Sequence, residues 1–144
     1  IKSRSLEIKI ILNNKKKEQI INSLVSNFNL NLTLNLDYTN ITPGNFLKFN
    51  FIFDENKISL EDDFIKNLTI ILNLYKKNKD VMYIDLILFL TNFHFNSLKI
   101  NNIISKEKLI EHKRFVFENV NKFFLYNLNQ NALINAINNK IINE

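Results

Sequence analysis

The side chains best suited to acid–base chemistry are the two histidines, His94 and His112. A general acid or base needs a second titratable or nucleophilic group within hydrogen-bond reach, and a metal needs several ligands at defined spacings. Neither histidine has a neighbour along the chain at such a spacing. His94 lies between Phe93 and Phe95, which predicts a partly buried structural imidazole. His112 follows Glu111 in a charged segment, which predicts a solvated side chain, so no catalytic pair is expected.

Three consecutive carboxylates, Glu61, Asp62 and Asp63, have the chemistry of a divalent-cation site. Ser59 and Asp62 resemble a capping box, which places the carboxylates in the first turn of a helix. Anionic side chains there stabilise the helix dipole, and this interpretation is favoured over metal binding. The chain has no cysteine and one glycine, so it lacks thiolate ligands and a glycine-rich phosphate loop. We predict that the protein is not an enzyme and binds no metal or cofactor.

Lysine clusters are the strongest candidates for binding, and the net charge of +5 agrees with an anionic partner. The expected first helix carries Lys15, Lys16 and Lys17 in its first turn, where each cation opposes the dipole by about 0.3 to 1 kcal/mol. An RNA phosphate there would offset that cost, although codon bias alone also scatters lysines over a solvated surface. The residues predicted to bind RNA are Lys15, Lys16, Lys17, Lys76, Lys77, Lys79, Lys113 and Arg114. Glutamates alternate with the last two, which also fits a solvated helix face.

The composition indicates a gene of extreme AT bias. The chain has 27 Asn, 22 Ile and 17 Lys against 2 Arg and 1 Gly, a skew that mutation pressure explains better than structure. An organelle-encoded mitochondrial protein is favoured over one from an AT-rich nuclear or bacterial genome. The apolar, uncharged run over residues 86–98 is too short to span a bilayer, so no transmembrane segment is expected.

Alternation of apolar and polar residues predicts three strands, over residues 6–10, 30–36 and 47–53. Residues 81–90 are apolar on both alternating faces apart from Asp85, which predicts a fourth strand that is covered on two sides. Helices are expected to start at Asn13 or Asn14, at Ser59 and at Ser105, and a short helix is expected over residues 132–142. Pro43 and Gly44 predict a chain reversal between two of the strands. This order predicts an α+β, ferredoxin-like (βαββαβ) domain over residues 1–100, with a four-stranded antiparallel sheet and two helices on one face. Residues 101–144 are expected to form a C-terminal helical extension.

The C-terminal helices carry more apolar residues than the expected sheet needs for its cover, which predicts a protein interface. The residues assigned to it are Phe117, Phe124, Leu133, Ile137 and Ile141.

Together these patterns predict a structural, non-catalytic subunit of a large assembly, foremost a mitochondrial ribosomal protein. Its partners would be rRNA, bound through the lysine clusters, and neighbouring proteins, with no small-molecule substrate. Two alternatives stay open: an accessory subunit of a respiratory or ATP-synthase complex that contacts protein through its C-terminal helices, and a free-standing regulatory domain.

Overall fold

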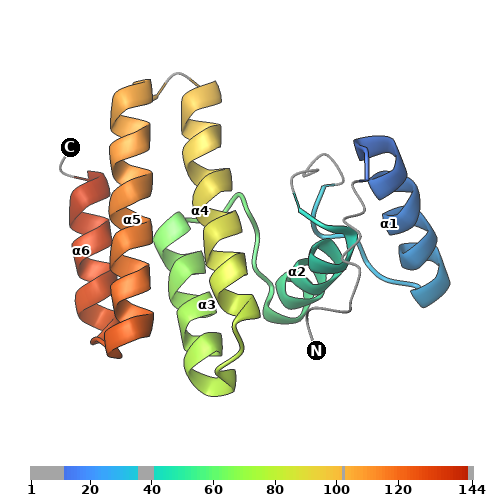
Figure 1. Cartoon of the computed structure of the whole chain (residues 1–144), viewed down its shortest axis with the longest axis horizontal. Coiled ribbons are helices and arrows are strands. Elements are labelled where there is room, and N and C mark those ends of the chain that lie inside the picture. The colour runs from blue at the N-terminus through green and yellow to red at the C-terminus, as the bar shows by residue number, and fades with distance from the viewer. Residues whose placement is uncertain (1–11, 36–40, 102, 143–144) are drawn as a thin grey trace, which may run out of the picture. The chain divides into compact units, whose positions relative to one another are not determined.

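The computed structural model describes residues 12–35, 41–101 and 103–142 of the chain. In this part of the chain there are six α-helices and no strand (Figure 1). The helices are α1 (Asn14–Phe28), α2 (Pro43–Asn56), α3 (Phe64–Asn78), α4 (Met82–Ile100), α5 (Lys106–Tyr126) and α6 (Gln130–Ile142). They belong to two compact units, Ile1–Ile58 (unit 1) and Ser59–Glu144 (unit 2).

The predicted ferredoxin-like α+β fold is therefore wrong. Residues 47–53 lie inside α2 and residues 81–90 run into α4, so two of the expected strands are helical. The described part of the third, residues 30–35, is irregular, and the strand expected over residues 6–10 lies outside the described residues.

The start of α2 explains why the Pro–Gly pair does not form a hairpin. Thr42 is the N-cap, and its side chain accepts a hydrogen bond of 3.2 Å from the backbone N–H of Asn45. Pro43 follows at the first helical position, where its missing N–H costs nothing and its fixed φ favours the helix. These local features start a helix, which then buries Phe46, Phe49 and Phe53 along one face.

The backbone of residues 31–34 is hydrogen-bonded to α2 instead of to a neighbouring strand. Asn50 of α2 is buried, and its Oδ1 accepts hydrogen bonds from the backbone N–H groups of Thr33 (2.8 Å) and Leu34 (3.0 Å). Its Nδ2 donates to the carbonyl oxygen of Asn31 at 2.6 Å. The side chain of Asn50 thus forms hydrogen bonds with backbone groups that would pair with a neighbouring strand in a β-sheet.

Unit 2 is a four-helix bundle in which successive helices run in opposite directions (Figure 1). α3 packs on α4, α4 on α5 and α5 on α6, and α6 closes the bundle against α3. The core stripe of α4 consists of Leu86, Ile87, Leu90, Thr91 and Phe95, spaced by three or four residues. The run at residues 81–90 is apolar on both alternating faces because α4 packs against two helices, α3 and α5, and a strand covered on two sides would show the same pattern.

Two helix starts predicted from the sequence are confirmed. The Asn13 side chain caps α1 by accepting from the N–H of Lys16 (2.9 Å), and Ser105 caps α5 by accepting from Lys108 (3.3 Å). Asn127 ends α5 in a left-handed conformation with φ of 50°. The start expected at Ser59 is wrong, because α3 begins at Phe64 and its N-cap is Asp63.

Candidate functional site

The two histidines belong to an aromatic cluster between α3, α4 and α5. The rings of His94 and Phe64 are stacked, Phe95 lies edge-on to His94 at 5.1 Å, and Phe95 and His112 lie 5.9 Å apart. The expectation of a solvated His112 is wrong: the side chain is buried, three residues after Leu109 and four before Val116 on the core stripe of α5. Burial lowers the pKa of His94, and the carboxylate of Asp63 partly opposes that shift. In this cluster the two imidazole rings contact the aromatic rings of Phe64 and Phe95.

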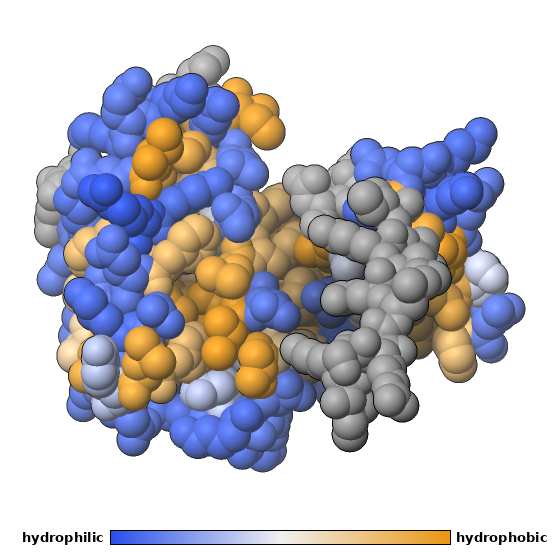
Figure 2. Space-filling model, in the orientation of Figure 1, coloured by the Kyte–Doolittle hydropathy of each residue, from blue (hydrophilic) through white to orange (hydrophobic). Residues whose placement is uncertain are grey.

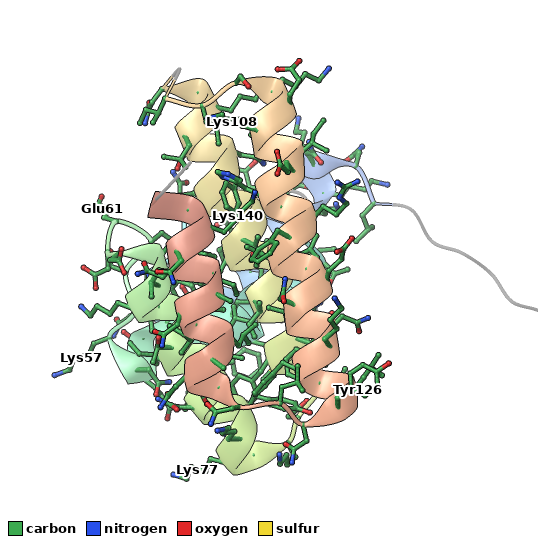
Figure 3. The ribbon with its side chains drawn as sticks, turned by 90° about the vertical axis from the view of Figure 1, so that its left-hand side faces the viewer. Lys57, Glu61, Lys77, Lys108, Tyr126 and Lys140 are labelled. Atoms are coloured by element: carbon green, nitrogen blue, oxygen red, sulfur yellow. The ribbon has the colours of Figure 1, made fainter. Side chains whose placement is uncertain are left out.

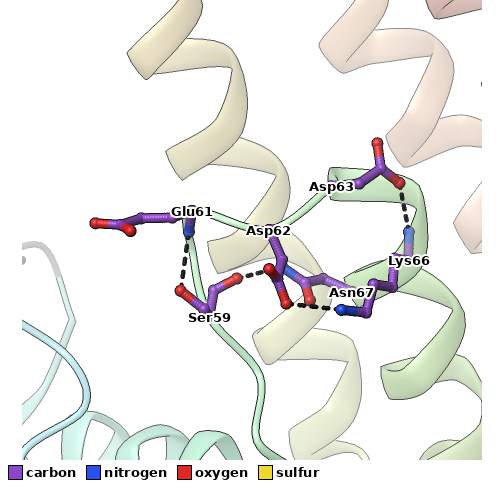
Figure 4. A network of polar contacts seen from close by, with 6 residues as sticks. All are labelled: Ser59, Glu61, Asp62, Asp63, Lys66 and Asn67. Carbon is purple, nitrogen blue, oxygen red and sulfur yellow. Dashed lines mark hydrogen bonds and ion pairs between the residues drawn. The ribbon is translucent and has the colours of Figure 1, made fainter.

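The acidic segment at the start of α3 is used to hold that helix end (Figure 4). Asp63 accepts from the backbone N–H of Lys66 at 2.8 Å, and Asp62 forms an ion pair with the Lys66 ammonium at 2.9 Å. The backbone N–H of Glu61 donates to the Ser59 hydroxyl oxygen at 3.2 Å, and buried Asn67 donates to the Ser59 carbonyl oxygen. Across the described ranges, the structure gathers no set of three histidine or carboxylate groups fit to hold a metal ion.

The lysine triplet of unit 1 lies where the sequence predicts it, in the first turn of α1. Lys15 and Lys16 are exposed and Lys17 is half-buried. The first turn contains no acidic residue, so the cations there face the positive end of the helix dipole with no carboxylate in that turn. The Asn13 side chain accepts a hydrogen bond from the backbone N–H of Lys16, and the Asn13 backbone carbonyl oxygen accepts one from the backbone N–H of Lys17.

The second lysine group surrounds the end of α3, where cations suit the helix dipole. Lys76 and Lys77 are in the last turn and are exposed. Lys79 is the C-cap with φ of 54°, and its ammonium lies 5.3 Å from the centre of the Tyr75 ring, within cation–π range. These three lysines form no ion pair within the described residues.

The third predicted group, Lys113 and Arg114, lies in the first half of α5. The Lys113 ammonium is half-buried and donates to Asn96 Oδ1 of α4 at 2.9 Å. Burial, and secondarily the nearby Lys99, lower the pKa of Lys113. Arg114 is exposed and lies 3.9 Å from Glu118, a pair of little energetic weight. The predicted RNA-binding residues of unit 2 therefore do not form one patch, since α5 runs from one end of the bundle towards the end that carries Lys76, Lys77 and Lys79.

The five residues assigned to a protein interface differ in how far they are buried in unit 2. Leu133 and Ile137 are buried in the bundle, and Phe117, Phe124 and Ile141 are half-buried. Phe124 packs edge-on against Tyr75 at 4.4 Å. The apolar stripe of α5 and α6 thus completes the four-helix core.

Exposed apolar side chains of unit 2 lie mainly at its two ends and were missed by the sequence analysis. At the end formed by the α4–α5 connection they are Ile100 and Ile103, with Ile110 further along α5. At the opposite end, formed by the α3–α4 and α5–α6 connections and lower in Figures 1 and 3, they are Val81, Leu125, Tyr126 and Leu128. Their positions off the core stripe become visible only once the helices are assigned.

Among the described residues, no helix combines the length and the apolar composition needed to cross a bilayer. Comparison of the chain with protein-family models, with curated proteins and with solved structures finds no match in any of the three.

Proposed function

We propose that the chain is a non-catalytic, RNA-contacting subunit of a ribonucleoprotein assembly, foremost a mitochondrial ribosome. The observation that carries the proposal is the lysine triplet Lys15–Lys17 in a first helical turn that has no carboxylate. The triplet costs helix stability in isolation, and a phosphate group at the same helix end would reverse the sign of that interaction. The mitochondrial assignment rests on the AT-biased composition.

Folded RNA suits this arrangement better than an extended single strand. Single-strand sites combine lysines with aromatic rings that stack on successive bases. The first turn of α1 offers lysines and asparagines and no aromatic ring. Contact with phosphates of a structured RNA needs only charge and hydrogen-bond donors, which lysine ammonium groups supply.

The competing role as an accessory subunit of a respiratory or ATP-synthase complex has less support. It required the C-terminal helices to offer an apolar face to protein neighbours. Leu133 and Ile137 of that face are buried within unit 2.

Salt-dependent RNA binding tests the proposal. The full chain is titrated with a structured RNA over a range of salt, and compared with a variant that carries Lys15→Gln, Lys16→Gln and Lys17→Gln. Loss of three phosphate contacts should reduce the slope of log affinity against log salt by roughly two to three. The charge-matched control carries Lys48→Gln, Lys106→Gln and Lys122→Gln, removes three exposed lysines elsewhere, and should keep most of the slope.

Sedimentation of the native protein from source-cell extract tests the assembly. Co-migration with a large particle that collapses on ribonuclease treatment supports the proposal. A large complex that resists ribonuclease overturns it and favours the respiratory or ATP-synthase alternative. If the triple variant binds RNA with unchanged salt dependence, the lysines of α1 do not contact RNA phosphates.

A further inference from the structure

One end of unit 2 exposes four apolar side chains, Val81, Leu125, Tyr126 and Leu128, which we call the apolar tip. Val81 lies in the connection between α3 and α4, Leu125 and Tyr126 end α5, and Leu128 lies in the connection to α6. Val81 and Leu125 are each 67% exposed and Tyr126 is 70% exposed, values that indicate side chains extending from the fold.

Contacts between helix ends place the two connections at the same end of the bundle. Tyr75 in the last turn of α3 packs edge-on against Phe124 in the last turn of α5, with ring centres 4.4 Å apart. Gln130 at the start of α6 donates to Asn73 Oδ1 of α3 at 2.8 Å. Figure 3 shows Lys77 and Tyr126 at this same end, and Lys108 at the opposite one.

Positive charge surrounds the apolar tip. Lys76, Lys77 and Lys79 end α3, and Lys122 lies one turn before the end of α5. The carboxylates on the helix ends and connections here are Asp80 and Asp85, and Asp80 accepts from the backbone N–H of Met82 at 2.8 Å. This end of unit 2 therefore has a net positive charge. In Figure 2, hydrophobic and hydrophilic residues lie next to one another in the lower part of unit 2.

We propose that this end of unit 2 docks on the surface of an anionic lipid bilayer, with the apolar tip in the headgroup layer and the surrounding lysines against lipid phosphates. Apolar insertion and lysine attraction to anionic headgroups are the two contributions that give peripheral membrane binding. Tyrosine is favoured at this depth because its ring is apolar and its hydroxyl is polar.

The same side chains suit other partners less well. Val81, Leu125 and Leu128 are aliphatic and cannot stack on bases, which argues against single-stranded RNA as the occupant. They lie at helix ends and in connections, whereas a helical peptide docks in a groove along helices. The apolar tip belongs to unit 2 and the lysine triplet to unit 1, and they share no residue, so the proposal does not depend on RNA binding.

Vesicle flotation tests the proposal with the full chain. The probes are vesicles of phosphatidylcholine alone and of phosphatidylcholine mixed with phosphatidylserine. The unmodified protein should float with the anionic vesicles and stay behind with the neutral ones. The double variant Leu125→Asn, Leu128→Asn should reduce partitioning by about tenfold or more, because two inserted side chains are lost. Lys76→Gln with Lys77→Gln should weaken binding and its salt dependence.

The matched control is Ile100→Asn with Ile103→Asn, which removes two apolar side chains at the other end of unit 2 that are at least as exposed as Leu125 and Leu128. It should bind vesicles as the unmodified protein does, and helical circular dichroism should show that all variants remain folded. Because the chain has no tryptophan, Tyr126→Trp provides a single reporter, whose emission should move to shorter wavelength on anionic vesicles.

Three results would overturn the proposal. The first is no flotation with either vesicle. The second is equal loss of binding in the tip variant and the control. The third is an unshifted tryptophan emission in Tyr126→Trp combined with loss of structured-RNA binding in the tip variant, which would assign this end to RNA.

Discussion

The rings of Phe64 and His94 are stacked, with centroids 4.5 Å apart and planes inclined by 15°. Phe64 is the first residue of α3 and follows its N-cap, Asp63, while His94 belongs to α4. The pair therefore fastens the start of one helix to the side of the next. Stacking against apolar rings favours the neutral imidazole, and burial lowers the pKa of His94 while Asp63 partly opposes the shift.

We expect the stability of unit 2 to fall in mild acid because of His94. Its pKa is lower in the folded chain than the ordinary 6.5, so the unfolded chain binds more protons as the pH falls. The contribution is fully present above about pH 6.5 and is lost as the pH falls towards the folded pKa. Urea midpoints at about pH 7.5 and about pH 5.5 measure the loss, which should be smaller in His94→Phe. Equal losses in both proteins would show that other groups cause the acid sensitivity.

Replacing Asn50 should loosen the segment of unit 1 that its side chain holds, residues 31–34. Asn50→Ala removes the acceptor for the N–H groups of Thr33 and Leu34 and the donor to Asn31. Because Leu34 is buried, its amide is left without a partner, and we expect unit 1 to lose about 1 to 3 kcal/mol of unfolding free energy. Hydrogen exchange at Thr33 and Leu34 should accelerate at the same time.

Asn45→Ala is the control for this change, because Asn45 is also on α2 and its side chain is not used to hold residues 30–35. Its exchange rates at Thr33 and Leu34 should match those of the unmodified chain. Acceleration in both variants would mean that the segment is held by α2 as a whole.

The prediction of α2 as a strand failed because two periodicities coincide over residues 47–53. Phe49 and Phe53 fit both an alternating pattern and a helical spacing of four. Phe51, which completes the alternation, is 54% exposed in the structure, so it carries no information about a buried face. An AT-biased gene places phenylalanine on the surface, and this weakens every inference from apolar periodicity. The Thr42–Pro43 pair is a local helix-start signal, and in the structure it outweighs the alternating pattern.

Two of the three predicted helix starts are confirmed, because a cap depends mainly on neighbouring residues, whereas the start expected at Ser59 is wrong. Asn13 and Ser105 were predicted from their own side-chain chemistry and are confirmed. His112 and Leu133 depend on the tertiary partners of their helices. The spacing of His112 from Leu109 and Val116 could have placed it in the core, whereas the closure of α6 against α3 had no local cue in the sequence.

Ile137 should contribute strongly to the stability of unit 2. It is fully buried on α6, so Ile137→Ala leaves a cavity and should cost about 2 to 5 kcal/mol of unfolding free energy. Ile110→Ala makes the same chemical change at a position that is 55% exposed and should cost far less. Chemical unfolding of both variants measures the difference. Equal losses would contradict the assignment of α6 to the bundle core.

The pKa of Lys113 should depend on the charge of Lys99. Burial is the main cause that lowers the pKa of Lys113, and repulsion from Lys99 adds to it. We therefore expect Lys99→Gln to raise the pKa of Lys113 part of the way towards its ordinary 10.5, as measured by NMR titration of lysine side chains.

The lowered pKa of Lys113 also fixes the sign of its effect on stability. The folded chain releases this proton at lower pH than the unfolded chain does, so unfolding free energy rises as the pH passes through the folded pKa and levels off above 10.5. Lys99→Gln should flatten that rise, and Lys122→Gln, near the far end of α5, should leave it unchanged. A pKa of Lys113 that does not move in Lys99→Gln would mean that burial beside Asn96 is the whole cause.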